Sequence, residues 1–230
     1  MKRKRSSTIE SYFKAPAKIP SAKFINRPKI AIIGTSGRKN SLYNALLSGA
    51  IYQEMVDIAL DTIQNTFGLD PKQCDLISGG AAWSDHVAVT LFNRGNVHGL
   101  TIYAPCPFSG NKFVDNHQSK DWRENPGYIS NVYHGKFSTK IGGNTLGEIH
   151  TAQTKGAVID ARYHGFHKRD GVIASTATHM IAFSWSDSGA PADGGTIYTW
   201  NRCHLPLATH KIHINLKEIC ERLGIVLPQV

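Results

Sequence analysis

The feature of the sequence that most limits its fold is a regular alternation of short apolar runs with longer helical stretches. The run KIAIIG, residues 29–34, is unbroken and rich in β-branched residues, as is typical of a strand buried on both faces. An amphipathic stretch follows over residues 41–66, and it ends at the stop signal FGLDP. Strands that alternate with helices predict an α/β fold with a doubly wound, mainly parallel sheet of Rossmann-like type.

The same rhythm continues to the end of the chain and predicts a single domain over residues 29–230. One connection is long for such a fold: residues 105–142 are polar and aromatic, and we expect them to form a lid-like loop. Its rings Trp122, Tyr128 and Tyr133 could stack on a base, or pack on one another. The other predicted strands are 74–80, 99–106, 157–163, 179–185 and 209–216, and the other predicted helices are 84–95, 145–156, 168–177, 194–203 and 216–224.

The positive charge of the chain is concentrated at its start. Residues 1–29 hold nine of the 26 basic side chains and one of the 17 acidic ones, which is +8 of the formal +9. The rest of the chain is nearly neutral, so a globular surface that binds nucleic acid through many phosphate contacts is not expected. Nucleic acid is a possible partner through the basic tail.

Residues 1–28 are rich in Lys, Ser, Ala and Pro, and we expect them to be a disordered tail. The cluster KRKR, Lys2 to Arg5, predicts nuclear localisation or contact with an acidic polymer. The following SSTIESYF resembles the PCNA-interacting peptide: Ile9, Tyr12 and Phe13 match its three hydrophobic anchors, while Ser6 stands where that motif has Gln. The resemblance implies the sliding clamp PCNA as a partner through residues 6–13; the alternative is a solvated tail with a chance pair of aromatic residues.

Metal and membrane functions find little support in the sequence. The four cysteines are scattered and form no CxxC pair, which argues against a zinc knuckle or a disulfide framework. His164 and His167 lie close together, but no Cys or carboxylate at ligand spacing accompanies them, so no metal site is expected. No apolar run approaches the roughly 20 residues of a membrane span.

Three predicted strands end in glycine and small hydroxyl residues. The carboxyl ends of parallel strands meet at one edge of the sheet, where helix N-termini converge and ligands bind. Bare backbone there lets N–H groups approach an anion, and the helix dipole adds partial positive charge. We therefore expect a phosphate or nucleotide site, with Asp85 either bound to a ribose hydroxyl or capping a helix. The predicted site residues are Gly34, Thr35, Ser36 and Arg38 after the first strand, Gly79, Gly80 and Asp85 after the second, and Gly194, Gly195 and Thr196 before a later helix.

The pattern is neither GxGxxG nor GxxxxGK[ST], but in combination it resembles a known superfamily. The pieces IAIIGTSGR, LISGGAAWSDHVA, FHKRDGVIASTATHMIAF and GGTIYTW are similar, in order, to those of the Rossmann-like SLOG superfamily. That group contains the DNA-processing protein DprA, the Lonely Guy phosphoribohydrolases and sensors of NAD-derived nucleotides. The resemblance implies a nucleotide phosphate or ribose near Gly34, Ser36, Gly79, Gly80, Gly195 and Thr196, with no further cofactor required, and allows a homodimer.

Enzymatic activity stays open on this resemblance. Arg169 matches the Arg of the Lonely Guy motif, which makes it an anion ligand and a catalytic residue if the chain is an enzyme. Thr199 stands where those enzymes have their catalytic Glu, and a hydroxyl cannot replace that carboxylate, so Asp85 or Glu148 would have to substitute. Three hypotheses follow: a nucleotide-binding protein tethered to replication sites, a nucleotide or nucleoside N-glycosidic hydrolase, and a DprA-like binder of single-stranded DNA.

Overall fold

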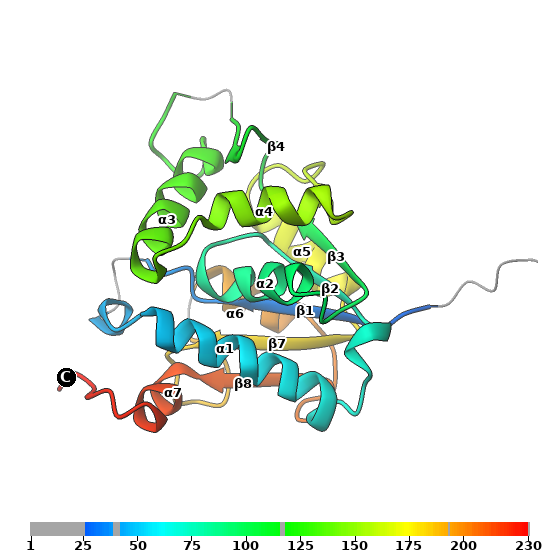
Figure 1. Ribbon diagram of the computed structural model, residues 1–230, viewed down its shortest axis with the longest axis vertical. Coiled ribbons are helices and arrows are strands. Elements are labelled where there is room, and N and C mark those ends of the chain that lie inside the picture. The colour runs from blue at the N-terminus through cyan, green and yellow to red at the C-terminus, as the bar shows by residue number, and fades with distance from the viewer. Residues whose placement is uncertain (1–25, 39–41, 116–117, 193, 230) are drawn as a thin grey trace, which may run out of the picture.

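Figure 1 shows a computed structural model of the chain, which describes residues 26–38, 42–115, 118–192 and 194–229. Its centre is a six-stranded sheet with the strand order β6-β3-β2-β1-β7-β8, in which all neighbouring strands run parallel. The predicted α/β class with a doubly wound parallel sheet is confirmed. The strands are β1 (Lys29–Gly34), β2 (Asp75–Ser78), β3 (Gly99–Tyr103), β6 (Val158–Asp160), β7 (His179–Ser184) and β8 (Lys211–Asn215).

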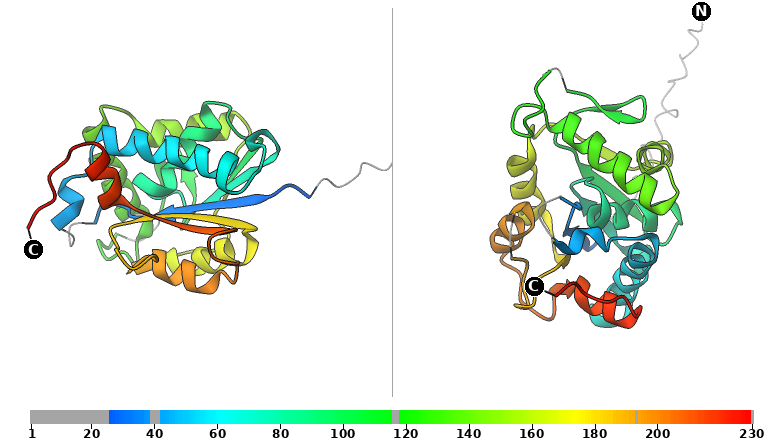
Figure 2. Two further views of the ribbon diagram at one scale, coloured as in Figure 1. Left: turned by 90° about the horizontal axis from the view of Figure 1, so that it is seen from below. Right: turned by 90° about the vertical axis from the view of Figure 1, so that its left-hand side faces the viewer.

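Helices cover both faces of the sheet (Figure 2). Successive side chains of β1 point to opposite faces: Ile30 and Ile32 pack into the larger core, and Ala31 and Ile33 into the smaller one. The strand is therefore buried on both sides, as its unbroken apolar run predicts. The larger core lies under α1 (Gly49–Asp61), α2 (His86–Asn93), α3 (Pro126–Ile141), α4 (Thr145–Thr154) and α7 (Leu216–Arg222), and the smaller under α5 (Phe166–Thr176) and α6 (Gly194–Arg202).

The order of the strands reverses between β1 and β7. The chain adds β2, β3 and β6 on one side of β1, and then crosses to the other side to add β7 and β8. Such a switch point leaves a crevice at the carboxyl ends of the two strands, and it is the position at which open α/β sheets bind their ligands. The predicted first and third glycine turns lie at this point.

The first predicted helix begins later than expected. Residues 42–45 form a short 3₁₀ helix, and α1 starts at Gly49, where the Ser48 side chain accepts a hydrogen bond from the Ile51 amide. The helical spacing of the apolar residues continues through this break, but Ser is a favoured N-cap residue, and Ser48 therefore starts a new helix. Beyond α1, one wider helical turn, Thr62–Thr66, completes the predicted stretch.

The prediction of a lid-like loop over residues 105–142 is wrong. This segment contains a hairpin, β4 (Phe108–Ser109) and β5 (Lys112–Phe113), followed by the 16-residue helix α3. Asn125 caps α3 and Pro126 opens it, while Phe137 anchors it in the larger core with no exposed surface. The polar and aromatic composition of this segment favours a loop, although Asn125-Pro126 at its start and Gly142 at its end are ordinary signals for the start and end of a helix.

The basic cluster and the clamp-like peptide, within residues 1–25, lie outside the described residues. No helix in the described ranges is long and apolar enough to cross a membrane. Within the same ranges, no three His, Cys, Asp or Glu side chains are grouped so that they could hold a metal ion.

Candidate functional site at the carboxyl edge of the sheet

The end of β1 is tied directly to its neighbours at the switch point. The Thr35 amide donates to the Phe183 carbonyl of β7 at 2.9 Å, and the Thr35 carbonyl accepts from the Ser84 amide at 3.2 Å. The hydroxyl of Thr196, in the first turn of α6, donates to the Gly34 carbonyl at 2.9 Å. The structure thus brings the first and third predicted turns into contact, with the start of α6 over the end of β1.

The second predicted turn, Gly79–Gly80, is buried and is filled by the chain itself. The amides of Gly79 and Ala81 donate to the carboxylate of Asp85 at 3.1 and 3.3 Å, and the Gly80 amide donates to the Ser78 hydroxyl at 3.1 Å. These amides therefore do not face a phosphate. Asp85 ties the turn together instead of capping α2, to which its side chain gives no capping hydrogen bond.

Arg169 explains why the residue at position 79 has no side chain. Its guanidinium donates to the Gly79 carbonyl, and a Cβ on Gly79 would overlap it. In the same way Gly195 leaves room for a carboxylate, because its Cβ would lie 3.0 Å from Oδ2 of Asp170. Glycine at both positions allows a charged side chain from elsewhere in the chain to lie close to the backbone.

Asp85, Arg169 and Asp170 form a buried charged cluster, and each residue is only 6% exposed. Arg169 lies between the two carboxylates, with Nη1 3.7 Å from Asp85 Oδ2 and Nε 3.7 Å from Asp170 Oδ1. Its Nε has no hydrogen-bond partner among the described residues. The predicted site does not include Asp170, although this residue directly follows Arg169 in the same motif.

Burial sets the protonation of the two carboxyl groups. It raises the pKa of Asp85, with the Arg169 guanidinium and two backbone amides opposing the rise. It raises the pKa of Asp170 to about 6; Arg169 again opposes the rise, and the Asp85 carboxylate adds to it. A carboxylic acid that titrates near neutral pH beside an arginine is typical of binding and catalytic sites.

The solvent-facing layer of the site consists of Gly34 to Arg38 and Gly194 to Thr196. Arg38 and Gly194 are exposed, and Arg38 Nη1 lies 3.7 Å from the position that a Cβ of Gly194 would take. Thr199 does not face this layer, since it is buried and its hydroxyl donates to the Gly195 carbonyl inside α6. The accessible groups are therefore the bare first turn of α6, the loop after β1 and the Arg38 guanidinium.

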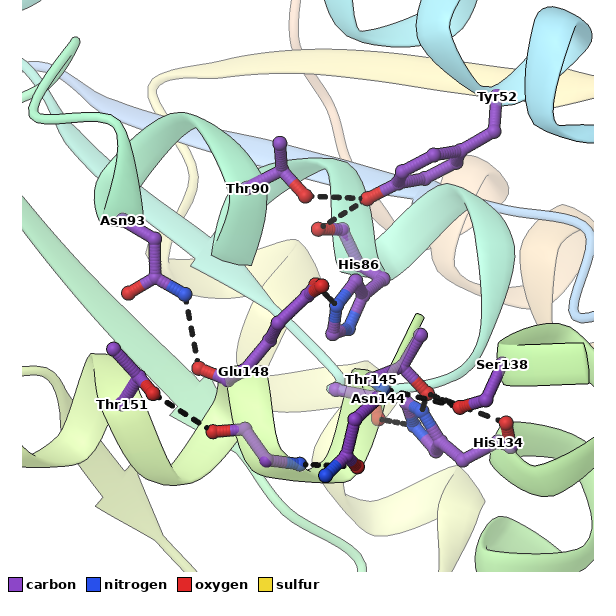
Figure 3. Close-up of polar contacts among 12 residues, drawn as sticks. Tyr52, His86, Thr90, Asn93, His134, Ser138, Asn144, Thr145, Glu148 and Thr151 are labelled. Atoms are coloured by element: carbon purple, nitrogen blue, oxygen red, sulfur yellow. Dashed lines mark hydrogen bonds and ion pairs between the residues drawn. The ribbon is translucent and has the colours of Figure 1, made fainter. Parts of the chain in front are cut away.

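Glu148 lies away from the charged cluster, in a polar network between α2, α3 and α4 (Figure 3). Its carboxylate is 2.7 Å from Nε2 of the fully buried His86, so the structure does not bring it to Arg169. In the same network His134 Nε2 is 3.0 Å from the Gly80 carbonyl, and its Nδ1 is 2.9 Å from the Thr145 hydroxyl. Burial lowers the pKa of His134 to about 3, so the neutral ring donates to Gly80 and supports the glycine turn from behind.

Comparison with known proteins places the chain in a family. No family model matches it. The uncharacterized protein R261 of Acanthamoeba polyphaga mimivirus is 35% identical to it over 188 residues, which cover 82% of this chain and 96% of R261. The chain belongs to the R261 family.

One solved structure extends the comparison beyond the R261 family. DNA processing protein A (DprA) of Streptococcus pneumoniae aligns with 87% of this chain at 13% identity and a TM-score of 0.43. The chain spans 56% of the length of that protein. Assignment of the fold rests on the strand order and the parallel pairing of the sheet.

Proposed function

We propose that the protein binds a nucleotide at the carboxyl edge of its sheet, with the phosphate between Arg38 and the first turn of α6. The observation that carries this proposal is the bare, solvent-facing turn Gly194–Thr196, which lies beside an exposed arginine at the switch point. Gly194 adds no side chain over the exposed start of α6, and the N-terminal N–H groups and dipole of a helix favour negative charge at such a position. The Arg38 guanidinium can supply a charge-assisted hydrogen bond from the other side.

The buried cluster below this turn suits the sugar end of such a ligand. Asp170 Oδ2 lies close to the backbone of Gly195, so its carboxyl group is near the place where a ribose would follow the phosphate. Carboxyl groups commonly bind ribose hydroxyls in Rossmann-like sites. Protonation of Asp170 also removes a negative charge that would repel the phosphate.

The test is calorimetric titration of the full chain with AMP and with ribose 5-phosphate. We expect both to bind, and Arg38→Gln to weaken both by about 10- to 100-fold, the cost of one charge-assisted hydrogen bond. Arg94→Gln is the matched control, because Arg94 bonds Gln53 on an exposed surface away from the site. Wild-type protein that binds neither compound, or equal losses in the two variants, would refute the site.

A second candidate function is hydrolysis of an N-glycosidic bond, and it is favoured by Asp170. Thr199 supplies no carboxylate, but Asp170 reaches the same helix from α5 and titrates near neutral pH, as a general acid or base should. Asp170→Asn should then abolish release of free base from a panel of nucleotides, while Arg38 and the first turn of α6 still bind the phosphate. Absence of base release by the wild-type protein across that panel would end this reading.

We also propose that residues 6–13 tether the protein to PCNA at replication sites in the nucleus. The support is the spacing of Ile9, Tyr12 and Phe13, which one turn of helix would gather on one face, after the basic cluster Lys2 to Arg5. Binding of DNA, if present, should then depend on the basic tail and be lost on deletion of residues 1–28. Retention of DNA binding by the remaining, nearly neutral chain would favour the DprA-like alternative.

A further inference from the structure

A pocket of aromatic side chains lies next to the buried cluster. It has a volume of about 420 Å³ and is formed where residues 122–123 meet the start of α5. The residues that line it include Trp122, Arg123, His164, Phe166, His167 and Lys168. Arg169 and Asp170 are the next two residues of the same helix, so the pocket and the cluster share one element.

Trp122, Phe166 and His167 of this pocket lie close together, and Tyr198, which does not line the pocket, lies beside His167. Trp122 lies 6.1 Å from Phe166 and 5.8 Å from His167, measured between ring centroids, and His167 lies 5.0 Å from Tyr198 of α6. His167 is exposed, and the other three rings are only half-buried. Among the described residues, Trp122, Phe166 and Tyr198 are members of neither core cluster. Aromatic rings that are kept partly exposed around a cavity are typical of a ligand site.

Arginine side chains already occupy positions over these rings. Arg123 lies 4.7 Å from the centroid of Trp122, and Arg169 lies 5.1 Å from that of Phe166. A cationic ligand would meet this positive charge and be repelled. A flat, neutral ring joined to an anionic group fits both the rings and the charge, and the volume lies within the range of small-molecule pockets.

We propose that the pocket between Trp122 and His167 is the subsite for the nucleobase of a nucleotide whose sugar phosphate lies at Asp170, Arg38 and α6. The inference rests on the proposed nucleotide site and adds a binding position for the base, which the phosphate site alone does not define. Phe166 connects the two subsites, since it lines the pocket and also lies under the Arg169 guanidinium. Stacking tolerates any base, because every base has a π-face.

The experiment compares AMP with ribose 5-phosphate, which lacks the base, by calorimetric titration of the full chain. We expect AMP to bind about 10- to 100-fold more tightly than ribose 5-phosphate, as one base-aromatic stack provides. Trp122→Ala should remove that difference and leave the affinity for ribose 5-phosphate unchanged. Trp122→Phe, which keeps a ring, should retain most of it. Binding of AMP should also quench tryptophan fluorescence in the wild type and much less in Trp122→Phe.

Tyr128→Ala is the matched control, because Tyr128 is an exposed ring of the same chain segment that does not line the pocket. It should leave both affinities unchanged. If AMP and ribose 5-phosphate bind equally to the wild type, the base subsite is wrong and the phosphate site stands. If neither binds, the proposed function fails and this inference fails with it. An equal loss for both ligands in Trp122→Ala would also overturn the base subsite.

Discussion

Asp170→Asn should make the protein more stable at neutral pH. The folded state raises the pKa of Asp170 from 3.8 to about 6, because the carboxyl group is buried and lies near Asp85. When folding raises the pKa of an acid, its contribution to stability is fully present at pH values below the pKa of the unfolded state. That contribution is lost as the pH rises through the pKa of the folded state. Each unit of pKa is worth 1.36 kcal/mol, so ionised Asp170 costs about 3 kcal/mol above pH 6.

The asparagine side chain removes this charge with little change of volume. Arg169 keeps two other partners, the Asp85 carboxylate and the Gly79 carbonyl, so the substitution does not leave the guanidinium without a partner. We therefore expect Asp170→Asn to unfold at a higher urea concentration than the wild type at pH 7.5, with the difference approaching about 3 kcal/mol. The difference should shrink as the pH falls from 6 to 4.

The measurement is the free energy of unfolding in urea for both proteins from pH 4 to 8. Asp187→Asn is the matched control: Asp187 is exposed and its pKa is lowered by Lys217 and Asn215, so its loss should bring no stabilisation at pH 7.5. If Asp170→Asn is less stable than the wild type at pH 7.5, the ion pair with Arg169 outweighs the cost of burial. The reasoning about the cluster would then be wrong.

Three further predictions concern the site and the tail. The affinity for sulfate should rise as the pH falls through about 6, because Asp170 then becomes neutral while the charge of sulfate stays constant between pH 4 and 8. An affinity for sulfate that does not change with pH in calorimetric titration would contradict this. Gly79→Ala should lower the free energy of unfolding in urea by about 1–3 kcal/mol, because the new methyl group displaces the buried guanidinium of Arg169. Gly171→Ala is the control: Gly171 has open space around it, so this substitution should leave the stability unchanged or raise it. Tyr12→Ala/Phe13→Ala should abolish co-precipitation with PCNA, and unchanged recovery of the clamp would remove the tether.

The sheet could be predicted because its strands leave a local signal. A strand that is buried on both faces, such as β1, needs apolar side chains in every position, and KIAIIG provides them. Helix α3 leaves no comparable signal, since Phe137 is the one large apolar side chain among its buried residues. Its start and end were readable from Asn125, Pro126 and Gly142, but local composition pointed to a loop.

The glycine turns show what a sequence cannot distinguish. A glycine is required wherever something approaches the backbone closely, and that neighbour can be a ligand or a side chain from elsewhere in the chain. At Gly79 the neighbour is Arg169, which is 90 residues away and therefore invisible to local pattern. At Gly194 no side chain of the described residues comes as close, and the nearest of their groups is the end of the exposed Arg38. Of these two turns, one is filled by side chains of the chain itself and the other begins at an exposed glycine, and we expect an anion from solution at the exposed one.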